Sequence, residues 1–180
     1  MRKIIAIGGE PATGKTTLMR AVIQNFTWEN KEPWKLVPTM YSESLDLHIV
    51  GKYADGDMFA GTDKTSMSVM PEAKKWVSQC TSNILFEGDR LFSGSFLEHC
   101  LTIPDVELHI LFIQATPENL EFRHKDRGDE QSEVFLKGRK TKYSNILGNF
   151  DLSDNIEMFN NNNLSEQGII IDRVLTLIKS

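Results

Sequence analysis

The stretch Gly9-Glu10-Pro11-Ala12-Thr13-Gly14-Lys15-Thr16 matches the pattern G-x-x-x-x-G-K-[ST] at every fixed position. An apolar run at residues 3–7 precedes it and an amphipathic segment at residues 16–26 follows it. We therefore expect a buried strand, a glycine-rich turn and a helix, the setting in which this motif is meaningful. In such a turn, backbone N–H groups form an anion-binding nest at the positive end of the helix. The sequence predicts a site for the phosphates of a nucleoside triphosphate.

The chemistry of the individual motif residues predicts their roles. We expect Lys15 to act as a catalytic point charge between the β- and γ-phosphates, and the Thr16 hydroxyl to bind Mg²⁺. ATP and Mg²⁺ are thus the predicted cofactors. The residues expected to bind the nucleotide within and just after the motif are Gly9, Ala12, Thr13, Gly14, Lys15, Thr16 and Thr17.

Beyond the motif, strand-like and helix-like segments alternate along the chain. The sequence predicts strands at 36–40, 47–50, 84–86, 106–113 and 156–159, and helices at 71–81, 91–101, 117–127, a basic stretch ending near 150, and 165–178. This alternation predicts an α/β fold, a doubly wound parallel sheet of about five strands with helices on both faces. A length of 180 residues fits a single domain spanning 1–180.

Composition limits the classes of partner. The chain has 20 Lys and Arg against 25 Asp and Glu, a net charge of −5. This balance argues against a protein that holds nucleic acid statically through many phosphates, but allows an enzyme that visits a polynucleotide through a local basic patch. Apolar runs such as residues 110–113 are too short to span a membrane. With two cysteines and no CxxC spacing, we expect a cytoplasmic protein with no membrane partner. The sequence does not indicate an oligomeric state.

Acidic residues follow the predicted strand at 84–86, in the sequence Phe86-Glu87-Gly88-Asp89-Arg90. Strand alternation would place Glu87 and Asp89 on one face, beside the glycine-rich turn. A carboxylate there can accept a proton from a substrate hydroxyl or bind the hydration shell of Mg²⁺. We expect Asp89 to be the base and a metal ligand, Glu87 to touch substrate or metal-bound water, and Arg90 to hold a phosphate. The alternative is that Asp89 caps the next helix and Arg90 pairs at the surface.

A basic segment at residues 123–142 predicts a lid over the triphosphate. We expect Arg123 and Arg127 to bind phosphate oxygens, with Arg127 acting at the transferring group, because guanidinium makes paired hydrogen bonds. Four more cations follow without an intervening acid, at Lys137, Arg139, Lys140 and Lys142. The alternative is a solvated helical face whose lysines pair with Glu130 and Glu133.

The segment 51–68 is rich in glycine and aspartate and has little periodicity, which is typical of a functional loop. Its mixture of aromatic and hydrogen-bonding side chains predicts an inserted loop that binds the acceptor of the phosphate. We expect Tyr53 and Phe59 to stack on a nucleobase, and Asp63 and Lys64 to hydrogen-bond its edge. The alternative is an ordered loop whose aromatic side chains pack on the core.

Three segments carry a resemblance to the nucleoside and nucleotide kinases of the P-loop group. They are residues 9–16, residues 86–90 and Arg123-His124-Lys125-Asp126-Arg127-Gly128. The second resembles the acidic–arginine pair of thymidylate and deoxynucleoside kinases, and the third resembles the start of their lid. Leu91 and the preceding Glu87-Gly88 depart from that pattern, which usually has an aromatic residue after the arginine.

The wider pattern at residues 51–69, 85–96 and 130–146 resembles a bacteriophage family of 5-hydroxymethyluracil DNA kinases. That resemblance implies transfer of the γ-phosphate of ATP to the 5-hydroxymethyl group of a base in DNA, a step in thymidine hypermodification. A kinase of a free nucleoside, nucleotide or other small hydroxyl metabolite shares every donor-side residue and stays open. So does a nucleotide-dependent switch, although the Asp89-Arg90 pair argues against it. A closed acceptor pocket would favour the free metabolite, and an open basic cleft would favour DNA.

Overall fold

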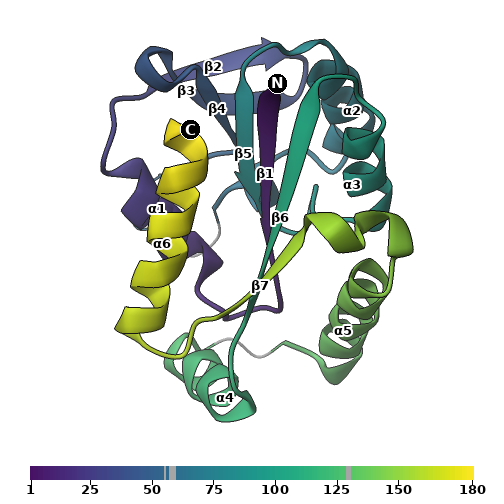
Figure 1. Ribbon diagram of the computed structural model, residues 1–180. Helices are drawn as coiled ribbons and strands as arrows, with labels where there is room; N and C mark the ends of the chain where they lie inside the picture. Colours follow the sequence, from purple (N-terminus) through teal and green to yellow (C-terminus); the bar gives the residue numbers. More distant parts are fainter. Residues whose placement is uncertain (55, 57–59, 129–130) are drawn as a thin grey trace.

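A computed structural model describes residues 1–54, 56, 60–128 and 131–180 of the chain. It shows one twisted sheet with helices on both faces, the predicted α/β architecture (Figure 1). In spatial order the strands are β2 (Glu29–Trp34), β3 (Val37–Ser42), β4 (Leu47–Val50), β5 (Asn83–Glu87), β1 (Arg2–Gly8), β6 (Val106–Gln114) and β7 (Ile156–Asn160).

The five strands β4, β5, β1, β6 and β7 run parallel, whereas β2 and β3 add an antiparallel hairpin at one edge. The sheet therefore has seven strands, and the prediction of about five describes only its parallel part. Strand β2 was not predicted because its residues 29–34 are polar, mostly exposed and include Pro33, which is tolerated at a sheet edge.

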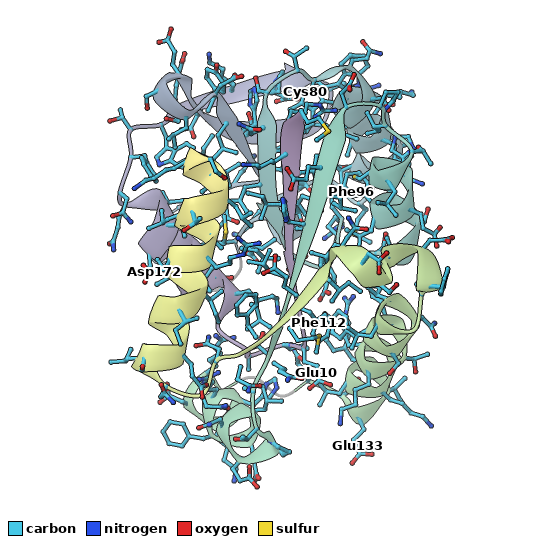
Figure 2. All side chains as sticks on the ribbon, in the orientation of Figure 1. Glu10, Cys80, Phe96, Phe112, Glu133 and Asp172 are labelled. Carbon is cyan, nitrogen blue, oxygen red and sulfur yellow. The ribbon has the colours of Figure 1, made fainter. Side chains whose placement is uncertain are left out.

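Alternate side chains of the central strand enter two separate layers of core. Ile5 and Ile7 of β1 pack under α1 (Lys15–Ile23) and α6 (Leu164–Lys179). Ile4 and Ala6 face the layer formed by α2 (Val69–Gln79), α3 (Gly94–Leu101) and α5 (Glu133–Leu147). Phe96 and Phe112 lie in that second layer (Figure 2). Because β1 is covered on both faces, its apolar residues form a continuous run rather than an alternating one.

The helices α4 (Pro117–Asp126) and α5 contain most of the predicted lid at 123–142. Thr116 caps α4 as its side chain accepts from the Asn119 N–H, which confirms the predicted helix start. The helix predicted at 91–101 begins instead at Gly94, where Ser93 provides the cap. No helix of the described part of the chain is long and apolar enough to cross a membrane.

The topology places the carboxyl ends of β4, β5, β1 and β6 at one edge of the sheet. Strands β5 and β6 flank β1, because the chain runs from β1 to β4 and β5 on one side and then crosses from β5 to β6 on the other. This switch point is where open parallel sheets form their ligand crevice.

Candidate active site

The glycine-rich turn between β1 and α1 can form only with glycine at its two ends. Gly9 has φ of 142°, and a Cβ there would lie 1.9 Å from the carbonyl oxygen of Ile113. Gly14 has φ of 89°, and a Cβ there would lie 2.6 Å from Asn161 Nδ2. Ala12, between them, also has a positive φ of 63°. The conformation fits a phosphate-binding nest at the start of α1.

Lys15 lies inside this turn and its ammonium is held by the turn's own oxygens. Its Nζ donates to the carbonyls of Gly9 and Glu10, each at 2.8 Å, and lies 3.4 Å from Thr13 Oγ1. Burial lowers the pKa of Lys15, and nearby Glu87 and Asp89 partly oppose that shift. Triphosphate oxygens would be stronger partners for this cation than neutral carbonyls are.

Thr16 and Tyr53 meet on the carboxylate of Glu87 at the end of β5. The Thr16 hydroxyl donates to Glu87 Oε1 at 3.2 Å, and the Tyr53 hydroxyl donates to the same oxygen at 3.4 Å. Glu87 is 2% exposed, and burial raises its pKa to about 7 although Lys15 acts in the opposite direction. Tyr53 was predicted to stack on a base, but its hydroxyl instead supports the carboxylate behind Thr16.

These groups fit the way proteins hold Mg²⁺ with a nucleotide. Thr16 and Glu87 offer oxygen donors beside the phosphate nest, and Mg²⁺ is usually bound by one or two such groups together with phosphates and water. Among the residues that the structure describes, no group of three or more His, Cys, Asp or Glu side chains could hold a metal ion. The site therefore suits a metal that arrives with its nucleotide.

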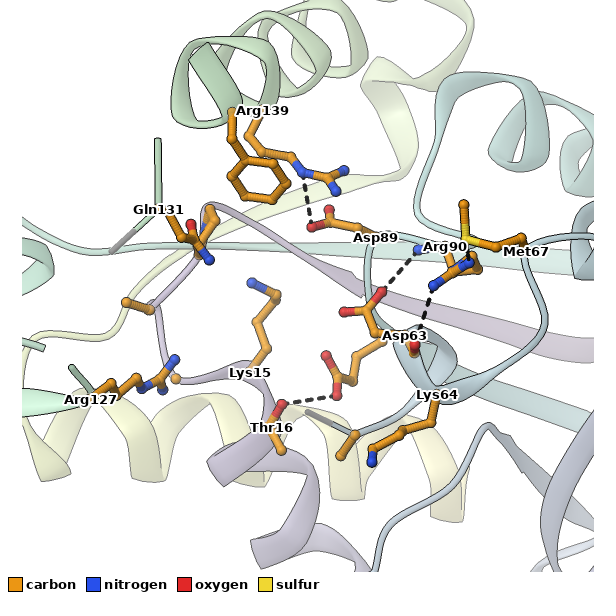
Figure 3. A pocket seen from close by; sticks show the side chains of 16 residues that line it. Lys15, Thr16, Asp63, Lys64, Met67, Asp89, Arg90, Arg127, Gln131 and Arg139 are labelled. Carbon is orange, nitrogen blue, oxygen red and sulfur yellow. Dashed lines mark hydrogen bonds and ion pairs between the residues drawn. The ribbon is translucent and has the colours of Figure 1, made fainter. Parts of the chain in front are cut away.

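A cavity of about 640 Å³ opens in front of the turn (Figure 3). Its walls come from the glycine-rich turn, the segment after β4, the end of β5, and the region from Arg127 to α5. It contains more cations than acids. The charged side chains that line it are Lys15, Lys64, Arg90, Arg127, Arg139, Asp63, Glu87 and Asp89. An excess of cations around a phosphate nest suits a polyanionic ligand.

The family model described as P-loop Nucleotide Kinase3 matches residues 1–157, most of the chain and all of the cavity. The chain belongs to the P-loop nucleotide kinase 3 family. It is a nucleotide-binding P-loop phosphotransferase, and residues 9–16 are its P-loop.

No curated protein matches the sequence. Solved structures with a similar chain path include an uncharacterized protein from Eubacterium ventriosum, 13% identical, with a TM-score of 0.49 over 99% of this chain and 98% of the other. Another is a gluconokinase from Sinorhizobium meliloti, 10% identical, with a TM-score of 0.45 over 98% of each chain.

In this P-loop nucleotide kinase, the carboxylate of Asp89 is held by side chains of α5. Its Oδ1 accepts from the Tyr143 hydroxyl and lies 3.5 Å from Lys142 Nζ, while its Oδ2 lies 3.4 Å from Arg139 Nε. The expected roles of base and metal ligand therefore do not match this geometry, in which Asp89 anchors α5. The alternative role is also wrong, because Ser93 and not Asp89 caps α3.

Three of the predicted acceptor residues, Asp63, Lys64 and Arg90, lie along one side of the cavity, whereas Tyr53 does not line it. Asp63 and Lys64 belong to the short 3₁₀ helix Thr62–Lys64 and line the cavity with Arg90. The Arg90 backbone N–H donates to Asp63 Oδ1 at 3.2 Å, and its guanidinium donates to the Asp63 carbonyl at 3.4 Å. Arg90 thus pairs within the site and not at a distant surface. Phe59 lies outside the described residues.

The lid arginines have different positions. Arg127 lines the cavity, and its role as a phosphate ligand stays a prediction. Arg123 instead clamps the P-loop from outside, donating to the Ala12 carbonyl at 3.2 Å and to the Asn161 carbonyl at 2.7 Å. Thr13 is buried with its hydroxyl on the Glu10 carbonyl, and Thr17 is exposed in the first turn of α1. Neither threonine side chain lines the cavity.

Sequence reasoning missed two residues that shape the site. Asn161 is 3% exposed and donates to the Thr13 carbonyl at 2.7 Å, so it fixes the P-loop from the turn after β7. It belongs to a run of four asparagines at residues 160–163, which has no periodicity that would indicate a role in the site. Tyr143 is also buried, and nothing in its local sequence links it to Asp89, 54 positions away. Glu130, which the alternative interpretation pairs with the lysines of the basic segment, lies outside the described residues.

Proposed function

We propose that this phosphotransferase moves the γ-phosphate of ATP to a hydroxyl group, and that the acceptor is the 5-hydroxymethyl group of 5-hydroxymethyluracil in DNA. The observation that carries the transfer is a single cavity in which the P-loop faces Asp63, Lys64 and Arg90. Donor and acceptor groups bound on facing walls of one cavity would meet without a further rearrangement of the sheet.

The chain's own groups supply binding and charge. The P-loop amides and Lys15 would hold the β- and γ-phosphates, with Thr16 and Glu87 at the metal. Mg²⁺, when bound, neutralises charge that develops on the phosphates. Arg127 and Arg139 line the same cavity and would stabilise the transferring group from the lid side. Each acts as a fixed cation, so catalysis would come from positioning and electrostatics.

The cations on the acceptor side support an acceptor that carries phosphates. Lys64 and Arg90 lie there, and Arg139 closes the wall from α5. A base turned out of the DNA stack brings flanking phosphodiesters to such a wall. The net charge of −5 would keep binding to bulk DNA weak and make recognition depend on this local region.

The size of the cavity favours a second candidate, a free nucleoside, nucleotide or other small hydroxyl metabolite. About 640 Å³ lies within the usual range for a single small-molecule site, roughly 300–1,000 Å³. The same cavity must also hold part of the triphosphate. A compact acceptor therefore fits the volume well, and a mononucleotide would also satisfy Arg90 and Lys64.

Labelled γ-phosphate transfer from ATP with Mg²⁺ onto matched acceptors separates the two. The acceptors are DNA containing 5-hydroxymethyluracil, the same DNA with thymine, the free modified nucleoside, and its monophosphate. We expect label on the modified DNA and none on the thymine control. Label on the nucleoside or monophosphate alone would identify a metabolite kinase and reject the DNA acceptor.

A further inference from the structure

Three carboxylates line the cavity, and two already have partners that define their roles. Glu87 receives hydrogen bonds from Thr16 and Tyr53 and so belongs to the metal side. Asp89 interacts with three side chains of α5, those of Arg139, Lys142 and Tyr143. Asp63 differs, because its Oδ1 accepts only the backbone N–H of Arg90, and its Oδ2 accepts no hydrogen bond from any residue that the structure describes.

The carboxylate of Asp63 points into the cavity from the acceptor wall, opposite Lys15 (Figure 3). Lys15 marks where the β- and γ-phosphates would lie. A hydroxyl group between these two side chains would have a phosphate on one side and a carboxylate oxygen on the other. General-base transfer requires that arrangement.

Backbone packing fixes the position of Asp63. Gly88 has φ of 111°, and a Cβ there would lie 2.6 Å from Thr62 Oγ1 and 3.2 Å from Asp63 Cγ. The turn at Thr62–Asp63 therefore rests directly on the backbone at the end of β5. This contact gives a physical reason for glycine at position 88.

We propose that Asp63 is the general base of the transfer, a role that rests on the proposed function. Its Oδ2 takes the proton of the acceptor hydroxyl as the acceptor oxygen forms a bond to the γ-phosphorus. The bond from that phosphorus to the β–γ bridging oxygen breaks, and its electron pair stays on the nucleoside diphosphate. The proton then passes from Asp63 to solvent when the products leave.

The charges around Asp63 suit this role. Burial raises its pKa, Asp89 at the end of β5 raises it further, and the Arg90 N–H, Lys15 and Arg139 oppose the shift. Glu87 and Lys64 also line the cavity around it. A carboxylate with a raised pKa is a stronger base.

The test compares Asp63→Asn with Asp172→Asn, a matched change at an exposed position of α6. We expect Asp63→Asn to lower kcat by about 10²-fold or more without weakening MgATP binding. The wild-type kcat/KM falls at acid pH as the base protonates, and this fall disappears in Asp63→Asn. A kcat equal to that of Asp172→Asn, with the acid fall retained, overturns the proposal.

The variant Gly88→Ala tests the position of the Asp63 carboxylate separately from its ability to accept a proton. It keeps the carboxylate but displaces it, so kcat drops while the acid fall in the pH profile remains. An unchanged kcat in a folded Gly88→Ala protein contradicts the packing argument.

ATP hydrolysis, with water in place of the acceptor, gives a readout that needs no identified substrate. If the wild type phosphorylates none of the acceptors, the proposed function fails. Hydrolysis that is then slower in Asp63→Asn still supports the base, and hydrolysis that is equally fast rejects it.

Discussion

Lys15 is the residue on which nucleotide binding depends most directly. It is the cation inside the P-loop, where its Nζ donates to the carbonyls of Gly9 and Glu10. We expect Lys15→Ala to lower phosphoryl transfer by about 10²-fold or more, because one preorganised donor is commonly worth that much. The fold should persist, since the change removes a buried charge without opening the sheet. Transfer assays together with circular dichroism check both parts, and full activity in a folded Lys15→Ala protein would reject the P-loop assignment.

Glu87 makes the stability of the ligand-free protein depend on pH. Its pKa is about 7 in the folded chain, above the ordinary value of 4.5, so folding favours the protonated acid. The contribution of this raised pKa to the free energy of unfolding is complete below about pH 4.5. It declines as the pH rises and is lost above about pH 7, a change of about 3 kcal/mol.

The variant Glu87→Gln cannot titrate and should lack that decline. Urea unfolding at about pH 5 and about pH 8 measures the difference. We expect the wild type to lose more stability than Glu87→Gln across this interval. Parallel losses in the two proteins would show that Glu87 titrates normally.

At the scale of elements, Asp89 holds α5 to the end of β5 through Arg139, Lys142 and Tyr143. Tyr143→Phe removes the buried hydroxyl that donates to this carboxylate and leaves the aromatic packing against Phe92 and Phe112 in place. Leaving a buried charged acceptor short of one partner costs about 1–3 kcal/mol. We expect a lower melting temperature and faster amide exchange in residues 133–147 than in α6. Unchanged exchange in α5 would contradict its anchoring by Asp89.

The elements differ in how far the sequence predicts them. Strong periodicity or a clear cap predicted α4, α6 and the parallel strands to within a few residues. The sequence did not predict strand β2, because edge strands need little apolar surface. In the site, the motif located Lys15 and Thr16, but the residue types could not rank Asp63, Glu87 and Asp89. Their roles follow from partners such as Tyr143, which are distant in sequence and meet only in the fold.

At the scale of the whole molecule, one sheet carries both cores, so the chain should unfold as one unit. We expect a single thermal transition that rises by roughly 5–10 °C with MgATP at about 100 times its Kd, since such binding adds about 2.7 kcal/mol. Lys15→Ala should abolish most of this rise. Calorimetry measures it, and two separated transitions would contradict the single-domain prediction.

The most direct test of the account is where the γ-phosphate goes. The measurement follows labelled ATP with Mg²⁺ and wild-type protein, and compares label on the acceptor hydroxyl with label released as inorganic phosphate. The account predicts that nucleoside diphosphate forms in step with phosphorylated acceptor, and that its formation accelerates when acceptor is added. Release of inorganic phosphate alone, at a rate that no acceptor changes, would instead indicate a nucleotide-dependent switch and contradict the kinase.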